Sequence, residues 1–495
     1  MKTGRFKRGL VATFACAFAL AVNASPPVFH ATRIGVLPGS TNSVGTGVNF
    51  DGVVVGWATA GTAPPRAWRH SGTTLTDLRL GGIGHTALGI NDRGEIVGFV
   101  LDSPTTSLAY RLIDNAIISL TAPGAANVAF AINASGHAAL SYVTSAGIRP
   151  ARYVQSVTDL GSFGGSEGAA YGINANGQLV GYSDNAAGNA RAFLWANGSL
   201  QDLGTLGGPF SVAFAINVHG EIVGSSATAV VNQARAFLYY NGQMTDLGSL
   251  GGSNSSAQAI NDASQIVGRA TTALGASNGF LFHDGAMYDL NALVVSGLNG
   301  AHLTYGIAIN NKSQIVAHAC PTQTTCQTFR LDPVAPAGKV RAIVYYHAAF
   351  DHYFLTTIDD EVAKLDNGTF VGWTRTGESI NVDAEAPAGT VPVCRFFSAS
   401  FAPKSSHFYT PFAAECETVK QNPLWTFEGE VFRVALPDPT GACTNGRSPV
   451  YRLYNNGMGA APNHAYTTSL NKRAALVAKG WIPEGLGDLG VIMCV

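Results

Sequence analysis

Charged residues are scarce in this sequence: only 12% of its 495 residues are Asp, Glu, Lys or Arg. They form no basic stripe, which argues against nucleic acid as a partner. They also form no polybasic or amphipathic segment, which argues against binding to a membrane surface. The hydrophobic residues, 46% of the total, fall in short bounded runs. A chain of this length and composition is expected to fold, as two or three domains.

Long hydrophobic runs are also missing, since no stretch reaches the roughly 18–20 apolar residues of a membrane-spanning helix. One shorter run, GLVATFACAFALAV, follows the basic segment MKTGRFKR. Small residues at a cleavage position follow it, with Val22 and Ala24 at the key places. This pattern is typical of an export signal. We therefore predict a signal peptide over residues 1–24 and an exported, extracellular or periplasmic mature chain without a membrane span.

Catalytic signatures are equally scarce, because the sequence has no HExxH, P-loop or calcium-loop pattern. Ser166 lies in a GxSxG pattern, but a nucleophile elbow needs a strand-to-helix turn, and this segment continues a repeated phrase. Carboxylate pairs can hydrolyse glycosides. The acids of the first 330 residues, however, recur mainly at repeat positions, and Glu95 and Glu221 are expected to face solvent. No catalytic residue and no cofactor is predicted, and non-catalytic function is favoured.

Glycine is abundant, with 58 residues, and much of it belongs to a repeat. A hairpin phrase, such as AINVHGEIVG at 215–224, occurs seven times at steps of 41 to 49 residues. A period of that length is typical of propellers and solenoids. A second hairpin, such as RAFLWANGSLQDLGTLGG at 191–208, lies between successive copies. Four short strands per period correspond to one propeller blade.

The two ends of the repeat region favour a closed ring. Neither end offers the polar cap that an open solenoid requires. Residues 31–39 match the outer strand of a hairpin, and residues 327–333 match the strand that should precede it. Pairing these two segments would remove the open sheet edges. We predict an all-β-dominated chain with a seven-bladed β-propeller over residues 25–332, closed by its C-terminal strand.

An asparagine opens the turn in every copy of the hairpin phrase. Its side chain can accept a local backbone hydrogen bond, and the glycine three residues on tolerates positive φ. A ligand site would be expected once rather than seven times, so we interpret the asparagines as structural turn residues. They are Asn49, Asn91, Asn133, Asn174, Asn217, Asn261 and Asn310.

These phrases also carry a resemblance to a known family. Chains built from AFLW, DLGxLGG and AINxxGxIVG resemble the bacterial HAF extracellular repeat family, and the resemblance covers about residues 31–332. It implies export and a repeat architecture. It implies no activity.

A second pattern begins after PVAPAGK (333–339), which we predict to be a linker. Residues 340–495 contain three copies of an aromatic strand, a His, an aromatic–Thr pair, a helix-like segment and a Trp-x-x-x-Gly motif. This predicts a pseudo-threefold β-rich module with one short helix per copy. The Thr before each helix-like segment is the expected N-cap. These threonines are Thr356, Thr410 and Thr467.

The segments HFYT, GWIPEG and VYRLYNNG resemble a C-terminal domain of unknown function found in exported bacterial proteins, sometimes appended to secreted hydrolases. The resemblance implies an accessory role and supplies no catalytic residues.

Two repeated side chains of this module are candidates for binding. His352, His407 and His464 could hold zinc if a threefold axis brought them together. Buried histidines that bond to neighbouring turns are the alternative, and no metal is predicted. The candidate ligand-binding residues are Trp373, Trp425 and Trp481, since such aromatics suit sugar surfaces. Core packing at their fixed spacing is the favoured alternative.

Cysteine is sparse, and Cys16 falls in the leader. An even number of six remains, without any CxxC pair, which favours three disulfides in an exported chain. The simplest pairing joins neighbours in sequence, although other connectivities stay open. It would join Cys320 to Cys326, Cys394 to Cys416, and Cys443 to Cys494.

These observations predict an exported non-catalytic recognition protein, a monomer, whose ligand is a glycan or a cell-surface protein. One alternative is a propeller glycoside hydrolase or lyase with the C-terminal module as an accessory domain. The other is a structural cell-surface repeat protein. Carboxylates that converge in one place would favour the enzyme, whereas exposed aromatics would favour binding.

Overall fold

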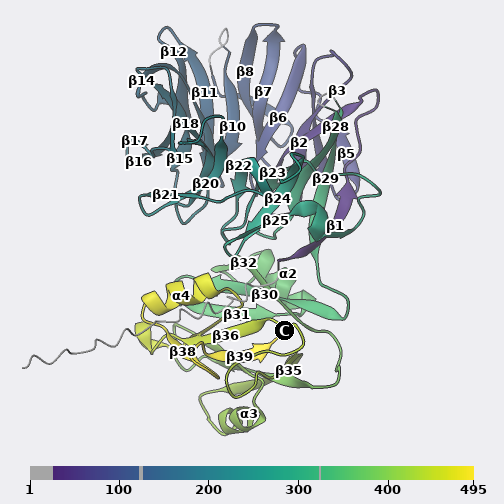
Figure 1. The fold of residues 1–495 in the computed structure, drawn as a ribbon, viewed down its shortest axis with the longest axis vertical. Coiled ribbons are helices and arrows are strands. Elements are labelled where there is room, and N and C mark those ends of the chain that lie inside the picture. The colour runs from purple at the N-terminus through teal and green to yellow at the C-terminus, as the bar shows by residue number, and fades with distance from the viewer. Residues whose placement is uncertain (1–25, 122–125, 323–324) are drawn as a thin grey trace, which may run out of the picture.

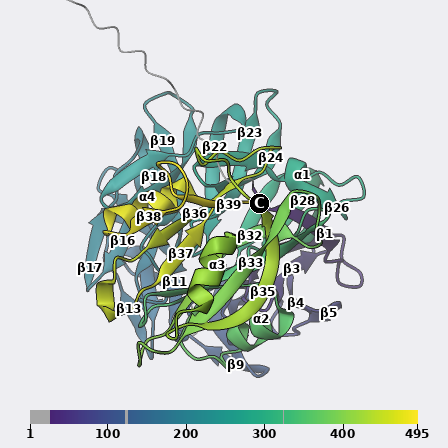
Figure 2. The ribbon, with the colours of Figure 1, turned by 90° about the horizontal axis from the view of Figure 1, so that it is seen from below.

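The computed structural model describes residues 26–121, 126–322 and 325–495, so the expected signal peptide (1–24) lies outside the described residues. The described chain forms two bodies, a ring of sheets and a smaller β-rich module below it (Figure 1). Seen from below, the module lies across one face of the ring (Figure 2). Within the described ranges no helix is both long and apolar enough to cross a membrane.

Seven sheets in the described residues form the propeller blades, and six of them are four-stranded. Their strands are β2 (Asn42–Val48), β3 (Val54–Thr59), β4 (Arg66–Ser71) and β5 (Thr74–Asp77); β6 (Gly84–Ile90), β7 (Ile96–Ser103), β8 (Thr106–Ile113) and β9 (Ala116–Ser119); β10 (Val128–Ile132), β11 (Ala138–Thr144), β12 (Gly147–Tyr153) and β13 (Val157–Asp159); β14 (Gly164–Ile173), β15 (Leu179–Asn185), β16 (Ala190–Ala196) and β17 (Ser199–Asp202); β18 (Gly207–Ile216), β19 (Ile222–Thr228), β20 (Ala234–Tyr240) and β21 (Gln243–Asp246); and β22 (Gly251–Ile260), β23 (Ile266–Thr272), β24 (Ser277–His283) and β25 (Ala286–Asp289).

The seventh blade joins the two ends of the propeller. It consists of β27 (Tyr305–Ile309), β28 (Ile315–Thr322), β29 (Thr325–Val334), β1 (Val28–Arg33) and β26 (Val294–Ser296), the last preceded by the short helix α1 (Leu290–Leu293). Strand β1 pairs antiparallel with β29, with Ala31 opposite Leu331. In Figure 1 the purple N-terminal strand accordingly lies beside green strands. The predicted seven-bladed propeller and its closure are confirmed.

The innermost strand of each blade has a one-residue bulge at the same position of the repeat. In β18 the register shifts between Ala213 and Ala215, so that Phe214 is an extra, bulged residue. The glycine of the IVG phrase permits this bulge, because a Cβ on Gly224 would lie 2.0 Å from the carbonyl oxygen of Val212. Bulged aromatics of neighbouring blades meet, and the ring centroid of Tyr171 lies 5.7 Å from that of Phe214. These rings thus pack neighbouring blades against each other.

The C-terminal module is one sheet of ten strands with three helices longer than a single turn in its described residues. Its elements are β30 (Lys339–His347), β31 (His352–Thr356), α2 (Asp359–Asp366) and β32 (Trp373–Asp383); β33 (Thr390–Ser398), β34 (Ser406–Thr410), α3 (Ala413–Lys420) and β35 (Thr426–Ala435); and β36 (Pro449–Tyr454), the 3-10 turn η1 (Met458–Ala460), β37 (His464–Thr467), α4 (Leu470–Ala478), β38 (Ile482–Glu484) and β39 (Val491–Cys494). The three copies repeat strand, strand, helix, strand, as the sequence predicts.

The predicted N-caps of these helices are wrong by two residues. The hydroxyl of each threonine accepts a hydrogen bond from the amide two residues on, as Thr467 does from Ser469 at 3.0 Å. The N-caps themselves are Ile358, Phe412 and Ser469, and only the Ser469 side chain caps its helix. Each threonine therefore forms a turn that ends at the N-cap residue, and it lies two residues before the position from which it would cap the helix itself.

Three disulfides are present in the described residues, in the pairing of nearest neighbours in sequence. Cys320–Cys326 links β28 to β29 in the propeller. Cys394–Cys416 ties β33 to α3, and Cys443–Cys494 ties a loop to β39. The two disulfides with the larger sequence separations, 22 and 51 residues, therefore both lie in the module.

Candidate functional site

The seven repeated asparagines form a closed ring of hydrogen bonds. In every copy the side-chain nitrogen donates to the backbone carbonyl of the next asparagine, over distances of 2.8–3.3 Å. The last bond runs from Asn310 to Asn49 and closes the ring at 2.8 Å. Each side-chain oxygen also accepts from the backbone amide four residues on. These side chains therefore hold the turns and link the blades.

Sequence reasoning found the turn but missed the link between blades. The available signal was the choice of residue, because Asp or Ser would also suit the turn. Of the residues that suit this turn, only Asn carries both an acceptor oxygen and a donor nitrogen in its side chain. The use of Asn in all seven copies therefore pointed to a second bond.

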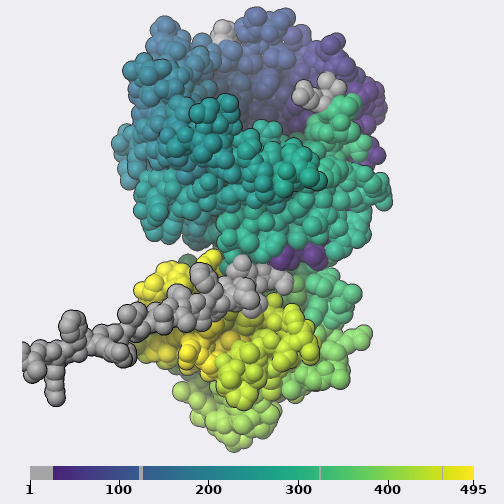
Figure 3. Space-filling view, in the orientation of Figure 1, coloured from purple at the N-terminus to yellow at the C-terminus, as the bar shows by residue number. Residues whose placement is uncertain are grey.

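The asparagine turns lie on the face of the propeller that meets the module. The Ser313 hydroxyl lies 3.4 Å from the carbonyl oxygen of Gly377 in β32. Nearby, Lys312 forms an ion pair with Asp366 of α2 at 3.6 Å. The two bodies remain distinct lobes that meet along this junction (Figure 3).

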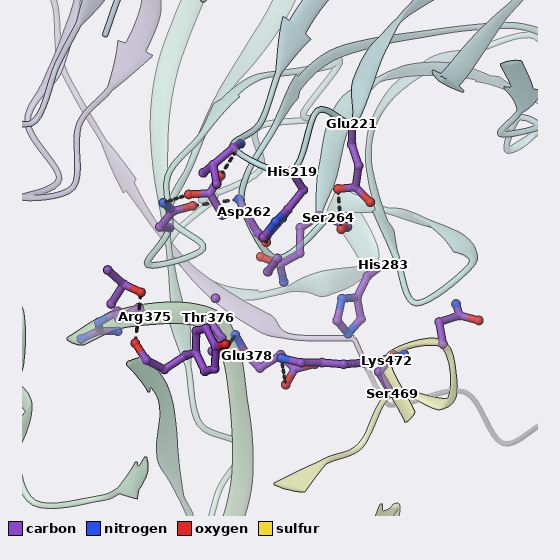
Figure 4. A pocket seen from close by; sticks show the side chains of 18 of the residues that line it. His219, Glu221, Asp262, Ser264, His283, Arg375, Thr376, Glu378, Ser469 and Lys472 are labelled. Carbon is purple, nitrogen blue, oxygen red and sulfur yellow. Dashed lines mark hydrogen bonds and ion pairs between the residues drawn. The ribbon is translucent and has the colours of Figure 1, made fainter. Parts of the chain in front are cut away.

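A cavity of about 950 Å³ lies at this junction. Its propeller wall comes from the asparagine turns and β24, and its module wall comes from β30, β31, β32 and α4 (Figure 4). The polar residues of the propeller wall include His219, Glu221, Asp262, Ser264, Gln265 and His283. The module wall includes Tyr345, Tyr346, Tyr353, Trp373, Arg375, Thr376, Glu378 and Lys472.

Two cations of the module wall are neutralised by carboxylates of the same module. Arg375 donates to both oxygens of Asp366, at 2.8 and 2.7 Å. Burial alone would raise the pKa of Asp366, but these bonds outweigh it and lower the pKa below its ordinary value. Lys472 donates to Glu378 at 2.9 Å. The module wall therefore presents paired charges beside half-buried aromatic side chains.

Glu221 of the propeller wall has no such cation. Its carboxylate accepts from Ser264 at 2.6 Å and from the ring residue Asn217, and no ion pair reaches it among the described residues. Glu95 occupies the same repeat position and forms ion pairs with Arg111 at 2.9 Å and Arg93 at 3.1 Å. The expectation that both acids face solvent is wrong: Glu95 is buried and Glu221 is half-buried against the cavity.

The module wall coincides with a break in the threefold pattern. In the second copy, Arg395 binds Glu361 of the preceding helix at 2.8 Å and Glu428 of its own Trp-x-x-x-Gly motif at 2.8 Å. The third copy repeats this arrangement with Arg452, Glu415 and Glu484, at 2.9 and 3.3 Å. In both corners a nearly buried arginine is held between two carboxylates.

The remaining corner, between the first and third copies, lacks all three members of this cluster. Tyr345 stands in the arginine position, two residues before the strand residue that faces the repeated His. Lys472 and Thr376 stand in the two glutamate positions. All three residues line the cavity. The cavity therefore occupies the corner where the repeat is interrupted.

The candidate tryptophans lie in different surroundings. Trp373 is half-buried and lines the cavity. Trp425 packs beside Phe408, with ring centroids 6.0 Å apart, and Trp481 is only 4% exposed. Ligand binding by the tryptophans stays a prediction, and the geometry favours it for Trp373 alone. Trp481 fits the core-packing alternative.

The three candidate zinc ligands are not brought together in a metal-binding arrangement. Nε2 of His352 lies 2.9 Å from Nδ1 of His407, whereas Nε2 of His464 lies 3.2 Å from a carboxylate oxygen of Glu484. Within the described residues, no group of three His, Cys, Asp or Glu has a geometry that would hold a metal ion. The three histidines are buried parts of the module core.

Comparison with known proteins identifies part of the module. Residues 344–490 match a family model described as a domain of unknown function, DUF5648. The resemblance of residues 31–332 to HAF repeats lies outside this match and stays a resemblance. No curated protein matches the chain.

Several solved structures are distantly similar. TolB from Acinetobacter baumannii is 14% identical over 41% of this chain and 53% of its own, with a TM-score of 0.33. The propeller domain of the trilobed protease from Pyrococcus furiosus is 8% identical over 51% and 84%, with a TM-score of 0.38. A puromycin-hydrolyzing peptidase from Mycobacterium tuberculosis is 11% identical over 63% and 56%, with a TM-score of 0.42. The chain thus spans about half the length of the TolB structure, and no activity is inferred from these likenesses.

Proposed function

We propose that this protein is an exported, non-catalytic recognition protein that binds a glycan in the cavity between its two bodies. The cavity itself is the observation that carries the proposal, because both bodies contribute side chains to it. Its volume of about 950 Å³ falls within the usual range for ligand sites, about 300–1,000 Å³. The three disulfides support export, since such bonds persist in oxidising compartments.

The composition of the cavity walls suits a sugar. The rings of Trp373 and Tyr346 are half-buried in the lining and offer apolar faces against which a sugar ring can pack. Opposite them, the propeller wall supplies carboxylate, hydroxyl and amide groups such as Glu221, Ser264 and Gln265. An oligosaccharide matches both walls, because its sugar rings have apolar faces that can pack on the aromatic residues and hydroxyl groups that can bond to the polar residues.

The test is a glycan-array screen of the mature chain, followed by titration of the best ligand. Replacing Trp373 with Ala should weaken binding at least about tenfold, because it removes the stacking face. Trp425→Ala is the matched control, since Trp425 does not line the cavity. Equal losses in both variants would contradict binding in the cavity, and a chain that binds no glycan would overturn the proposal.

One feature favours a glycoside hydrolase as a second candidate. Carboxylates project from both walls, Glu221 from the propeller and Glu378 from the module (Figure 4). Glycosidases use such pairs as acid and as base or nucleophile. Incubating the glycan that binds with wild type, Glu221→Gln and Glu378→Gln decides between the two. Recognition alone predicts no new reducing ends in any sample, whereas hydrolysis predicts release by wild type that either variant abolishes.

A further inference from the structure

The two walls of the junction cavity differ in their charge balance. The module cations Arg375 and Lys472 are paired with module carboxylates. On the propeller wall, Asp262 accepts hydrogen bonds from the Val218 amide and the Asn311 side chain, both neutral donors. Like Glu221, Asp262 forms no ion pair within the part of the chain that the structure describes. Of the remaining lining cations, Lys479 lies exposed at the end of α4. Glu221 and Asp262 therefore place negative charge on the propeller wall without an ion pair among the described residues.

The repeat shows that the glutamate without an ion pair is specific to the blade of Glu221. Arg111, which neutralises Glu95, lies opposite Val97 in its hairpin. Leu238 lies opposite Val223 and so takes the corresponding place in the blade of Glu221. A glutamate at this position is therefore neutralised by an arginine in the blade of Glu95, whereas the blade that lines the cavity has Leu238 in place of that arginine.

A further polar side chain of the cavity has an unused donor. Gln265 is only 3% exposed, and its side-chain oxygen accepts from Asn261 and Ser313 at 2.7 Å each. Its side-chain nitrogen has no partner among the described residues, although Gln265 lines the cavity. A ligand acceptor such as a sugar hydroxyl would satisfy it. Tyr346 and Trp373 of the module wall also line the cavity, and aromatic rings attract cations as well as sugar rings.

We propose that the ligand is an oligosaccharide that carries free amino groups, and that the Glu221 carboxylate binds its ammonium group. Gln265 donates to a neighbouring hydroxyl, and Trp373 and Tyr346 pack against the ring. This inference rests on the proposed glycan-binding function and adds the chemical class of the glycan.

Three β-1,4-linked hexasaccharides test this inference, made of glucosamine, N-acetylglucosamine or glucose. Each is titrated calorimetrically into the mature chain at pH 6, at low and at physiological salt. The glucosamine hexamer should bind at least about tenfold more tightly than the other two, with a larger loss of affinity in salt because its contact is ionic. Equal affinity for all three would overturn the amino-sugar inference and leave glycan binding standing. Absence of binding to all three would overturn this inference, and the array screen then decides the broader proposal separately.

Variants assign the effect to Glu221. Glu221→Gln keeps the size of the side chain and should abolish the preference for the glucosamine hexamer. Leu238→Arg supplies the cation that Glu95 possesses, and it should cause a similar loss while Glu221 remains in place. Glu385→Gln, an exposed residue outside the cavity lining, is the matched control and should leave the preference unchanged. Thermal unfolding of each variant establishes that it is folded, and a preference that survives both cavity variants would overturn the role of Glu221.

Discussion

The propeller and the C-terminal module are both built from repeats, but they differ in whether every copy keeps the same polar cluster. In the propeller, the asparagine ring is complete in all seven copies, including the blade that joins the two ends of the chain. In the module, the arginine–carboxylate cluster is present in two corners and replaced in the third. The third corner is the one that faces the propeller and lines the cavity.

The asparagines are required in every copy because each one completes the ring of hydrogen bonds. The cluster residues of the module are not required in every corner. Losing one asparagine would open the ring and leave buried backbone groups without partners. The third corner of the module is covered by the propeller, so its cluster could be replaced by Tyr345, Lys472 and Thr376. A departure from a repeat at a covered cavity is therefore a better marker of the candidate site than the repeat itself.

The largest contrast should appear when the long disulfide of the module is removed. Replacing Cys443 and Cys494 with Ser opens a loop of 51 residues and should lower the free energy of unfolding by about 4 kcal/mol. Replacing Cys320 and Cys326, only 6 residues apart, should cost about 2 kcal/mol. Urea unfolding followed by tryptophan fluorescence measures both. Equal costs would show that loop length does not set the contribution of these bonds.

A somewhat smaller effect is expected in an intact corner of the module. Arg452→Met leaves Glu415 and Glu484 without their cation and should cost about 3 kcal/mol, since the arginine side chain is only 7% exposed. At the equivalent place in the third corner, Tyr345→Phe removes one hydroxyl bond to Asp366 and should cost about 1 kcal/mol. Chemical denaturation of the two variants compares them. A greater loss for Tyr345→Phe would mean that the third corner supports the fold as strongly as the others.

The asparagine ring should be sensitive at a lower level. Asn174→Ala removes a side chain that bonds the carbonyl of Asn217 and the amide of Gln178, and it should cost about 2 kcal/mol. Asn176→Ala, in the same turn, removes only an exposed bond to Val218 and should cost less than about 1 kcal/mol. The melting temperatures of both variants measure the contrast. Similar shifts would show that the ring adds nothing beyond ordinary contacts between blades.

The smallest expected effect is a loss of stability of the module in acid, measured as the change in its free energy of unfolding per pH unit. Burial, followed by the neighbouring His407 and His347, lowers the pKa of His352 to about 2. Only the unfolded chain then takes up this proton below about pH 6.5, so the free energy of unfolding should fall by up to about 1.4 kcal/mol per pH unit as the pH drops from there. Urea midpoints between pH 7.5 and 5 measure the slope, which should be shallower in His352→Gln. A flat profile would contradict the buried, neutral histidine.

Most of the fold could be predicted from the sequence, because each structural unit is encoded by a motif that recurs in several copies. The seven copies of the Asn-turn phrase indicated the blade, and the unmatched strands near Ala31 and Leu331 indicated the closure. The N-caps were missed because Thr356 and its equivalents bond the amide two residues on. That bond is a turn which sequence alone does not distinguish from a cap.

The candidate site was largely hidden from the sequence. Trp373 was singled out, but nothing in its motif distinguishes it from the buried Trp481. Glu221 was set aside because it shares a repeat position with Glu95. The cavity arises from the docking of two bodies with unrelated repeats, and such docking leaves no periodic signal in the sequence. Only the absence of a partner arginine, with Leu238 in its place, marked Glu221 in advance.

The closed circle of asparagine bonds also has a consequence for how the propeller comes apart. In an open stack, terminal repeats fray and the loss spreads inward. A circle has no terminal member, so no blade can open without breaking the bonds to both of its neighbours. Native-state hydrogen exchange should therefore report similar protection for the amides bonded to these asparagines in all seven blades, with exchange through one global opening.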